Sequence, residues 1–300
     1  MAAKKMTKRV AIIGGGPAGM AAALQLHRFG IENILFEQGR TGSLLKNAWC
    51  VENYLGIYPG KSGIDLLQMF HRTLAKNEIK IVDAKVELLD YDFKFHLFKI
   101  KTFDKEYVVD CVIVASGTSP KTLTLIEKAK TKVEPYLFYE AFPLLKKRRK
   151  TIIIVGAGDV AFDNALNLAK HNKIIICNRS DNNGALPMLI TQALKHTNIT
   201  YYANSKLQSI ALGTFKNLDC TFANRQKRIR LNADYLIATI GRMPQKDFYT
   251  DKLKLFEQQL IRSSKLFLIG DVKNNVYRQV AIAVGDGILA AMRIFDQLTK

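Results

Sequence analysis

Cysteine is scarce in this sequence, and its four cysteines, at positions 50, 111, 177 and 220, are widely separated. No CxxC pair is present, and no two cysteines have the spacing of a metal site. The five histidines form no i, i+4 pair and have no carboxylate at a ligand spacing. We therefore expect no metal centre and no dithiol made by neighbouring cysteines. A thiol pair brought together from distant parts of the chain stays open.

Long uninterrupted apolar runs are also missing. The most apolar stretch, residues 10–26, is broken by Gly14, Gly15, Gly16 and Pro17, so it falls short of the roughly 20 apolar residues of a membrane helix. The same break argues against a signal peptide. We expect a cytoplasmic protein that does not enter membranes. With 300 residues, 48% of them hydrophobic, the chain is long enough for two globular domains.

Acidic residues are outnumbered, with 26 Asp and Glu against 45 Lys and Arg, a formal net charge of +19. Residues 120–244 hold 20 of the basic and 8 of the acidic residues, and two basic clusters stand out there, at residues 146–150 and 225–230. Neither cluster has the interleaved aromatic residues that stack on nucleic-acid bases. Each cluster is either a solvated turn beside a strand or a surface that attracts an acidic partner.

A glycine-rich turn between a strand and a helix occurs near the start of the chain. Residues 9–13 form the short apolar run of a buried parallel strand, and residues 14–19 then open a helix that we expect to end near Gly30. Residues 33–36 supply the next strand. This order is typical of a βαβ unit.

The same pattern is repeated in the second half. Residues 151–155 predict a strand, residues 156–161 a glycine turn that opens a helix, and residues 173–177 the following strand. A related segment closes each copy, residues 110–120 in the first and 234–244 in the second, with Asp, Ile, Gly and Pro in register. We predict an α/β fold with two Rossmann-like domains, the second inserted in the first, with boundaries at 1–119 plus 245–300 and at 120–244.

The first glycine turn has the residues that dinucleotide binding requires. Gly14, Gly16 and Gly19 let a phosphate approach the N-terminus of the following helix, where unpaired N–H groups and the helix dipole favour an anion. Glu37 ends the next strand 23 residues after Gly14, where a carboxylate can accept hydrogen bonds from both ribose hydroxyls of an adenosine. The first domain is therefore predicted to bind a dinucleotide.

The second turn differs at the residue that faces the ribose. Gly156, Gly158 and Ala161 occupy the three small positions, and Arg179 stands 23 residues after Gly156. A guanidinium there can pair with a 2′-phosphate, which favours NADPH over NADH, and Asn178 and Ser180 could add neutral hydrogen bonds. The alternative is a surface arginine at the end of a strand.

Two further segments extend the pattern to nearly the whole chain. The paired turns, Val51-Glu52-Asn53-Tyr54-Leu55-Gly56, and Gly270-Asp271-Val272 followed by Tyr277-Arg278-Gln279-Val280 resemble the two-dinucleotide-domain flavoproteins of the thioredoxin reductase type. The resemblance implies FAD in the outer domain, NAD(P)H in the inserted domain and a homodimer. It also implies that Asp271 binds the ribityl chain and that residues 278–280 contact the flavin ring, where a helix N-terminus stabilises negative charge.

The resemblance and the two turns together define the expected cofactor contacts. For FAD these are Gly14, Gly16, Pro17, Ala18, Gly19, Glu37, Gln38, Gly42, Leu45, Asn53, Val86, Ala115, Gly117, Asp271, Arg278, Gln279 and Val280. For NADPH they are Gly156, Gly158, Asp159, Val160, Ala161, Asn178, Arg179, Ser180, Gly241 and Arg242. No side chain is expected to act as a catalytic acid or base, because the flavin carries the chemistry.

The sequence departs from thioredoxin reductases at one decisive place. Those enzymes carry a CxxC shortly before the second glycine-rich strand, and the corresponding residues 133–142 here contain no cysteine. Cysteine-free relatives of this type include ferredoxin–NADP reductases. Asp163, within residues 159–166, is similar to the pattern of those enzymes in the helix after the second glycine turn. We therefore expect an NAD(P)H oxidoreductase that passes electrons to an acidic carrier such as ferredoxin or flavodoxin. The alternatives are a disulfide reductase that uses an external or non-local thiol, and a flavin-binding sensor with negligible turnover.

Overall fold

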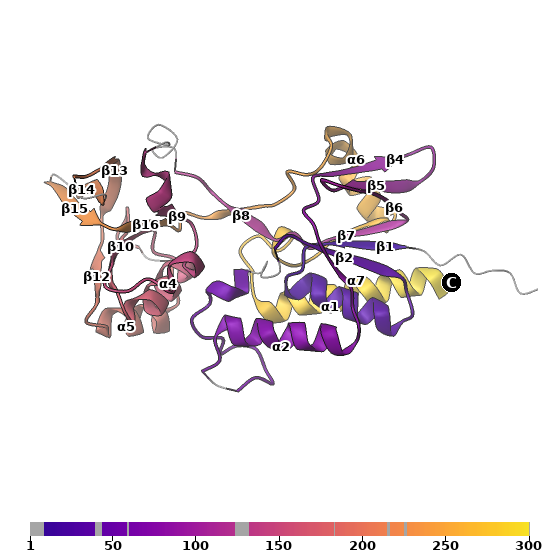
Figure 1. Ribbon diagram of the computed structural model, residues 1–300, viewed down its shortest axis with the longest axis horizontal. Helices are drawn as coiled ribbons and strands as arrows, with labels where there is room; N and C mark the ends of the chain where they lie inside the picture. Colours follow the sequence, from indigo (N-terminus) through magenta and orange to yellow (C-terminus); the bar gives the residue numbers. More distant parts are fainter. Residues whose placement is uncertain are drawn as a thin grey trace, which may run out of the picture. The chain divides into compact units, whose positions relative to one another are not determined.

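The computed structural model describes residues 9–39, 44–58, 60–123, 132–182, 184–214, 217–224 and 227–299. These residues divide into two compact units (Figure 1). Unit 1 contains the described residues up to Lys46, Val51–Ser119 and those from Met243 onward, and unit 2 contains Asn47–Cys50 and Pro120–Arg242. The return from the long segment of unit 2 to unit 1 thus comes at Met243, two residues before the expected start at residue 245.

Unit 1 is built on a parallel sheet whose strand order is β18-β7-β1-β2-β3. Each residue of β1 is buried, because helices cover one face of the sheet and a second sheet covers the other. The five strands are β1 (Val10–Ile13), β2 (Asn33–Glu37), β3 (Ile81–Asp83), β7 (Cys111–Val114) and β18 (Leu266–Leu268). The expected neighbours β1, β2 and β7 pair in register, with Val10 opposite both Asn33 and Cys111.

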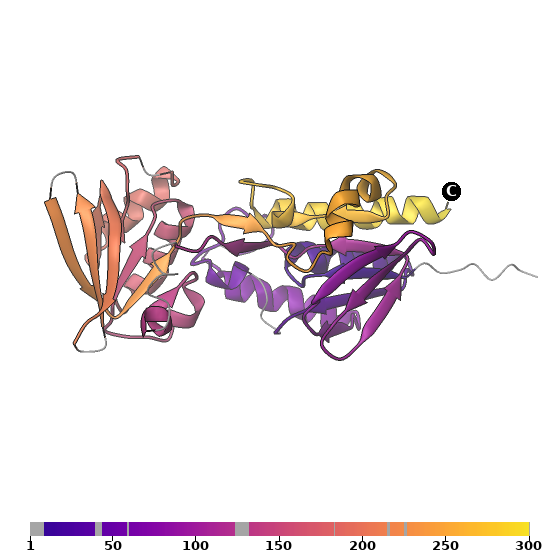
Figure 2. The same ribbon diagram turned by 90° about the horizontal axis from the view of Figure 1, so that it is seen from above.

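Among its described residues, unit 1 has four helices, namely α1 (Pro17–Arg28), α2 (Gly63–Lys76), α6 (Asp251–Arg262) and α7 (Val280–Thr299). Helices α1 and α7 pack side by side (Figure 2). Helix α2 begins with a capping box, in which the Ser62 hydroxyl and the Asp65 carboxylate accept each other's backbone N–H. Helix α6 is capped in a similar way by the Thr250 hydroxyl. Because α7 packs against α1, it completes the helical layer that α1 begins.

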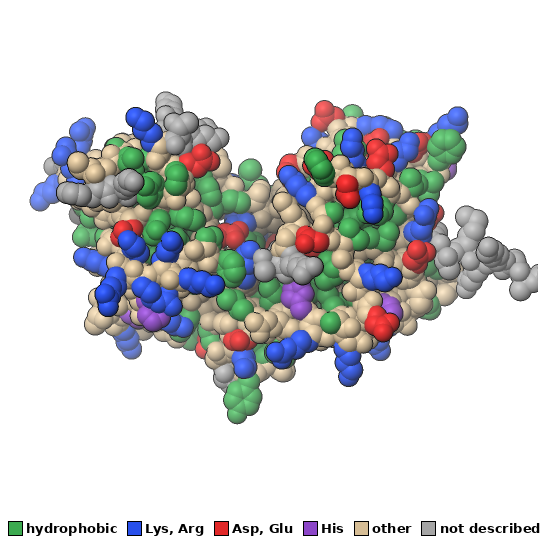
Figure 3. All heavy atoms as spheres, in the orientation of Figure 1, with side chains coloured by type: hydrophobic (Ala, Val, Ile, Leu, Met, Phe, Trp, Pro, Cys, Tyr) green, Lys and Arg blue, Asp and Glu red, His purple; other side chains and the backbone are tan. Residues whose placement is uncertain are grey.

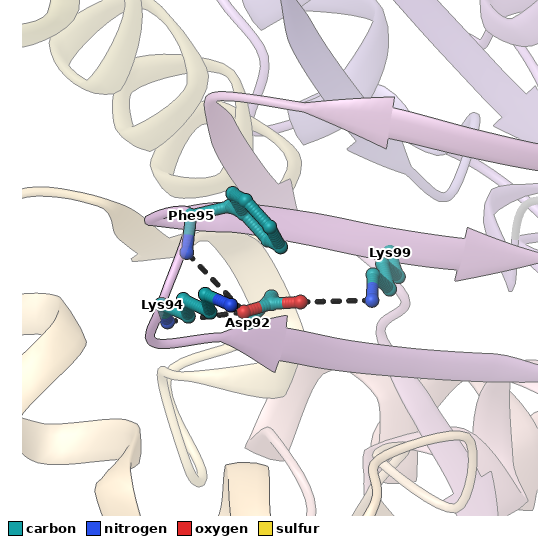
Figure 4. A network of polar contacts seen from close by, with 4 residues as sticks. All are labelled: Asp92, Lys94, Phe95 and Lys99. Carbon is teal, nitrogen blue, oxygen red and sulfur yellow. Dashed lines mark hydrogen bonds and ion pairs between the residues drawn. The ribbon is translucent and has the colours of Figure 1, made fainter.

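The opposite face of this sheet is covered by antiparallel strands β4 (Leu88–Asp92), β5 (Leu97–Lys101) and β6 (Glu106–Val109). They form an antiparallel sheet of order β4-β5-β6. Asp92 closes the β4–β5 turn by accepting the backbone N–H groups of Lys94 and Phe95, and it pairs with Lys99 at 2.8 Å (Figure 4). The hydrogen bond from Lys99 is the main cause of the lowered pKa of Asp92.

Unit 2 repeats this three-layer plan around a parallel sheet of order β12-β11-β10-β16-β9. Its strands are β9 (Leu137–Phe138), β10 (Thr151–Val155), β11 (Lys173–Cys177), β12 (Ile199–Tyr202) and β16 (Tyr235–Ala238). Helices α4 (Asp159–Ala169) and α5 (Pro187–Lys195) pack on one face. The antiparallel strands β13 (Ser205–Leu212), β14 (Leu218–Asn224) and β15 (Lys227–Ala233) pack on the other. The predicted α/β fold with two Rossmann-like domains is confirmed.

Short elements connect these layers. They are the 3₁₀ turns η1 (Leu44–Asn47), η2 (Glu134–Tyr136), η3 (Phe142–Leu144) and η4 (Gly270–Val272), and the strands β8 (Thr118–Pro120) and β17 (Arg242–Pro244). Strands β8 and β17, which contain the two main crossings of the chain, pair with each other. Within the described residues, no helix has the length and hydropathy needed to cross a membrane.

Candidate functional site: two glycine turns at helix N-termini

The turn after β1 brings the chain too close to β7 for any residue except glycine. Gly14 has φ +110°, and a Cβ at this position would overlap the carbonyl oxygen of Ala115. A Cβ at Gly19 would overlap the carbonyl oxygen of Gly14. Gly16 is the N-cap of α1 and supplies no side chain, and Pro17 occupies the first turn. The N-terminus of α1 is therefore an uncapped, closely approachable anion site.

Glu37 lies at the end of β2, next to this turn. Its carboxylate accepts the backbone N–H of Gly15. Burial is the main cause of the raised pKa of Glu37, and the hydrogen bond from Gly15 opposes that shift. The Glu37 carboxylate therefore lies beside the glycine turn, as the sequence predicts and as adenosine binding requires.

The segment that precedes α7 brings together two residues that the sequence separates widely. The Asn53 amide donates a 2.7 Å hydrogen bond to the Gln279 side chain, although the two lie 226 positions apart. Arg278 stands beside them, and its buried Nε has no hydrogen-bond partner among the described residues. An unpartnered buried guanidinium N–H is costly unless a ligand accepts a hydrogen bond from it. These residues, with the turn at Gly14, fit FAD.

The other expected FAD contacts belong to the same unit. Leu45, Val86 and Ala115 are buried, and Gly117 has φ +69° and accepts the backbone N–H of Gln245. Asp271 lies in η4, and Val280 is the first residue of α7. Ala18 is buried in the first turn of α1, and Gln38 follows β2. Gly42 lies outside the described residues. That each contacts the cofactor stays a prediction.

The second glycine turn reproduces the first in unit 2. A Cβ at Gly156, whose φ is +121°, would lie 2.6 Å from the carbonyl oxygen of Thr239. Gly158 is the N-cap of α4 and again supplies no side chain. Asp159 accepts the backbone N–H of Leu186 at 2.7 Å, while Val160 is exposed and Ala161 is buried. The turn thus presents a second helix N-terminus without a side-chain cap.

The loop after β11 has a buried half and an exposed half. Asn178 is buried and donates hydrogen bonds to the Asn182 carbonyl and the Tyr201 hydroxyl. Arg179 is exposed, and the described chain contains no carboxylate within ion-pair distance of it. Ser180 is also exposed and donates to the Asn182 carbonyl. Asn178 therefore shapes the loop, and Arg179 is the side chain it presents to solvent.

The remaining expected nucleotide residues lie at the end of the unit. Gly241 has φ +113° and accepts the backbone N–H of Lys121. Arg242 forms a 3.7 Å ion pair with Glu140. Both residues follow β16. Because β16 pairs in parallel with β10, its end lies at the same carboxyl edge of the sheet as the glycine turn that follows β10.

A short segment of the chain, Asn47–Cys50, is held against α4. The Trp49 backbone N–H donates to both carboxylate oxygens of Asp163, at 3.2 and 3.3 Å. The side-chain oxygen of Asn47 accepts the backbone N–H of Phe142, and its backbone carbonyl accepts a hydrogen bond from the side-chain amide of Asn167. Burial raises the pKa of Asp163 to about 6. The Trp49 ring packs against the core around α4.

The cysteines are poorly placed for redox chemistry. Cys111, Cys177 and Cys220 are buried, and Cys50 is half-buried. Cys177 and Cys220 share the core between β11 and β14. Burial raises the pKa of each of these two thiols to about 12. Because the thiolate is the reactive form, neither is a good nucleophile at neutral pH. The described residues also contain no cluster of three potential metal ligands.

Known proteins share this whole arrangement. The family profile of pyridine nucleotide-disulphide oxidoreductases matches residues 8–287. The chain belongs to this family. It is accordingly an FAD-dependent oxidoreductase that uses NADPH, and the predicted flavoprotein class and both predicted cofactors are confirmed.

Individual relatives match this chain over nearly their whole length. The chain is 28% identical to a thioredoxin reductase of Rickettsia conorii, covering 99% of this chain and 100% of the relative. It is 26% identical to a Clostridium pasteurianum protein named as a 34.2 kDa protein in a rubredoxin operon, with 94% of each covered. A thioredoxin reductase structure from Lactococcus lactis has the same fold, with a TM-score of 0.85 at 24% identity over 97% and 99% of the two chains.

Proposed function

We propose that this protein passes electrons from NADPH, through bound FAD, to an acidic one-electron carrier protein of the ferredoxin or flavodoxin class. FAD, when bound, accepts a hydride from the nicotinamide and releases the electrons to the acceptor. The observation that carries the choice of acceptor is the state of the thiols. No CxxC is present, and the two cysteines that share a core are buried with pKa values of about 12. A dithiol relay through this pair therefore lacks a reactive thiolate.

The roles of the individual residues follow from their surroundings. The uncapped N-termini of α1 and α4 bind the diphosphates of FAD and NADPH. Glu37 accepts the ribose hydroxyls of FAD, Arg179 pairs with the 2′-phosphate of NADPH, and Asn53 and Gln279 orient the flavin ring. Arg278 donates its unpartnered Nε–H to the flavin side of the site. These residues bind and orient, and none moves a proton.

A group of basic side chains gathers at one edge of unit 2. Parallel strands begin at the same edge of a sheet, so the segments that precede β10, β11 and β12 lie together. Backbone hydrogen bonds confirm this, since Arg149 donates to the His171 carbonyl and Lys173 donates to the Lys150 carbonyl. We call the exposed cations of these segments the amino-edge cluster: Lys146, Lys147, Arg148, Arg149, Lys170, Lys173 and Lys195. Basic side chains also crowd this part of unit 2, over α4 and α5, in Figure 3.

The amino-edge cluster is well suited to attract an acidic protein. Asp234 is the acidic residue at this edge, and it is already paired with Lys150 at 3.0 Å. The glycine turn at Gly156 and the loop of Arg179 follow the same strands and therefore lie at the opposite edge. A carrier on the amino-edge cluster does not compete with NADPH for those residues. The second basic segment is separate, because Arg228 and Arg230 stand on β15 in the antiparallel layer.

Charge neutralisation tests this proposal. We expect K146Q/K147Q/R148Q/R149Q to lower the rate constant for association with ferredoxin or flavodoxin by about tenfold at low salt. The difference should disappear near 0.5 M salt, because exposed charges are screened beyond about 10 Å already at 0.1 M. Reduction of the flavin by NADPH should not change. Stopped-flow measurements over a salt series, on the holoprotein, give both rates.

The matched control removes equal charge elsewhere on the same unit. K206Q/K227Q/R228Q/R230Q acts on four exposed side chains of β13 and β15, and it should leave the carrier reaction close to that of the parent. If both variants slow the reaction equally, the effect comes from net charge and the amino-edge cluster is not the docking surface. If neither does, the proposed surface is wrong.

A disulfide acceptor is the second candidate, because relatives in Rickettsia conorii and Buchnera aphidicola are thioredoxin reductases. An acceptor panel separates the two. NADPH oxidation is followed with ferredoxin, flavodoxin, rubredoxin, thioredoxin disulfide and a small aromatic disulfide. We expect turnover with at least one of the first three and none with the disulfides. Turnover with thioredoxin disulfide that a cysteine-free variant loses would instead show a thiol relay. A flavin that NADPH does not reduce would favour a sensor.

A further inference from the structure

The turn that carries Asp271 is wedged between two helices. Gly270 is buried with φ +68°, and a Cβ there would lie 2.9 Å from the Cβ of Ala18. Ala18 is in the first turn of α1, the helix whose N-terminus we assign to the FAD diphosphate. The turn η4 therefore lies next to that diphosphate site. A small displacement of this turn would move Asp271 relative to the cofactor.

One carboxylate of α7 holds this turn at both ends. Asp286 accepts the backbone N–H of Gly270 at 3.0 Å and the side-chain amide of Asn274 at 2.7 Å, both on Oδ2. Its Oδ1 pairs with the Lys273 ammonium at 3.1 Å, and the Asp286 side chain is only 13% exposed. Asn274 in turn accepts the backbone N–H of Tyr277. The contacts of Asp286 thus reach from η4 to the segment that presents Arg278 and Gln279.

The position of Asp286 is itself fixed against α1. A Cβ at the next residue, Gly287, would overlap the carbonyl oxygen of Ala18 and lie 2.9 Å from the backbone nitrogen of Ala22. The two helices are therefore in backbone contact one residue from Asp286. Lys273 supplies the opposite charge, so the carboxylate adds little repulsion toward a bound diphosphate.

We propose that Asp286 is a positioning residue for FAD, which fixes η4 and the segment before Gln279 against α1 so that Asp271 meets the ribityl chain. This inference rests on the proposed FAD contact of Asp271. Neither the glycine fingerprints nor the segments that resemble flavoproteins pointed to Asp286.

Release of FAD from the holoprotein tests the proposal without using turnover. After dilution, the recovery of flavin fluorescence gives the release rate. We expect Asp286→Ala to accelerate release by about tenfold to a hundredfold, because it leaves the buried Gly270 N–H without an acceptor. Asp286→Asn keeps an oxygen for that N–H, so release should stay within about threefold of the parent. Asn274→Ala removes a single hydrogen bond and should have an intermediate effect.

Glu257→Ala is the matched control. Glu257 is a helical carboxylate of the same unit, also 13% exposed and paired with a lysine, at 2.8 Å, but it is not bonded to η4. Its loss should leave FAD release within about twofold of the parent. Equal release from the parent, Asp286→Ala and Glu257→Ala would overturn the proposal. If Asp286→Ala does not accumulate as folded protein, Asn274→Ala takes its place in the comparison, and FAD release from it at the parent's rate would overturn the proposal.

A double variant separates positioning from general destabilisation. If Asp286 acts through Asp271, then D271A/D286A should release FAD no faster than Asp271→Ala alone. Effects that multiply would show that Asp286 only stabilises the unit, and would overturn the positioning role. If Asp271→Ala itself releases FAD at the parent's rate, the assignment of Asp271 fails. Fast release from Asp271→Ala combined with unchanged release from Asp286→Ala overturns only the role of Asp286.

Discussion

Arg179 is the side chain on which the choice of nucleotide depends in our proposal. It is exposed after β11, in a loop that the buried Asn178 holds in shape. We expect Arg179→Glu to lower kcat/KM for NADPH by roughly tenfold to a hundredfold, because a charge-assisted hydrogen bond to the 2′-phosphate is replaced by repulsion. The value for NADH should hardly change. Steady-state kinetics with both nucleotides measures the two effects.

A second arginine variant controls for net charge. Arg228→Glu changes an exposed arginine of the same unit, on β15, and should affect the two nucleotides alike. A parent enzyme that already prefers NADH would contradict the role of Arg179. So would an Arg179→Glu variant that discriminates no differently from the parent.

Residues with a fixed offset from a glycine turn could be predicted from the sequence, and others could not. Glu37 lies beside Gly15 because the length of a βαβ unit fixes the distance between the turn and the end of the next strand. Asn53 and Gln279 were expected only through resemblance, and they do meet. Asp286 gave no signal, because its importance comes from bonds to a turn on another element. The offset of Arg179 from Gly156 predicted a contact with the 2′-phosphate, but a surface arginine at the end of a strand would have the same sequence pattern.

At the scale of elements, the docking of Asn47–Cys50 on α4 is the least foreseeable feature. The segment lies between stretches of unit 1 in the sequence, yet its hydrogen bonds go to Asp163, Glu140 and Asn167 in unit 2. No local pattern encodes such an attachment, since periodicity reports only on the element that contains it. Strands and helices with strong apolar periods, by contrast, formed where the sequence predicted them.

This docking makes stability depend on pH. The ordinary pKa of an aspartic acid is 3.8, and burial raises that of Asp163 to about 6. The folded state therefore binds the proton more tightly than the unfolded state. The resulting stabilisation is complete at low pH and is lost as the pH rises through 6. We expect Asp163 to contribute about 1–2 kcal/mol more to stability at pH 5 than at pH 7.5.

Urea unfolding followed by the fluorescence of Trp49, the one tryptophan of the sequence, measures this difference. Asp163→Asn should remove it, since an amide does not titrate. Glu134→Gln removes an exposed carboxylate of the same unit and should leave it intact. The same dependence on pH in the parent and in Asp163→Asn would mean that other groups cause it.

At the scale of the whole molecule, we propose a homodimer formed through α7. One face of this helix is buried against its own unit, whereas Ile282, Leu289 and Met292 are 40%, 46% and 48% exposed. Their spacing places them on one side of the helix. A second copy of this chain would bury such an apolar face. We expect L289E/M292E to sediment as a monomer and the parent to sediment as a dimer.

Leu255→Glu supplies the control for this experiment. Leu255 is 82% exposed on α6, so the change alters surface charge without touching α7 and should leave a dimer. A parent that sediments as a monomer at micromolar concentration would refute the proposal. The double variant should also retain its FAD, which shows that the unit is still folded.

The insertion of unit 2 has a consequence for how the chain is made. Strand β18 and helix α7 complete the layers that begin with β1 and α1, and they leave the ribosome after the whole of unit 2. Unit 2 needs only residues up to Arg242, and its ends are joined by the pairing of β8 with β17. Domains fold as units during synthesis. The half of the protein whose translation starts first is therefore completed after the inserted half, and its open sheet must wait, with the position of β18 beside β7 still empty, while the inserted half folds.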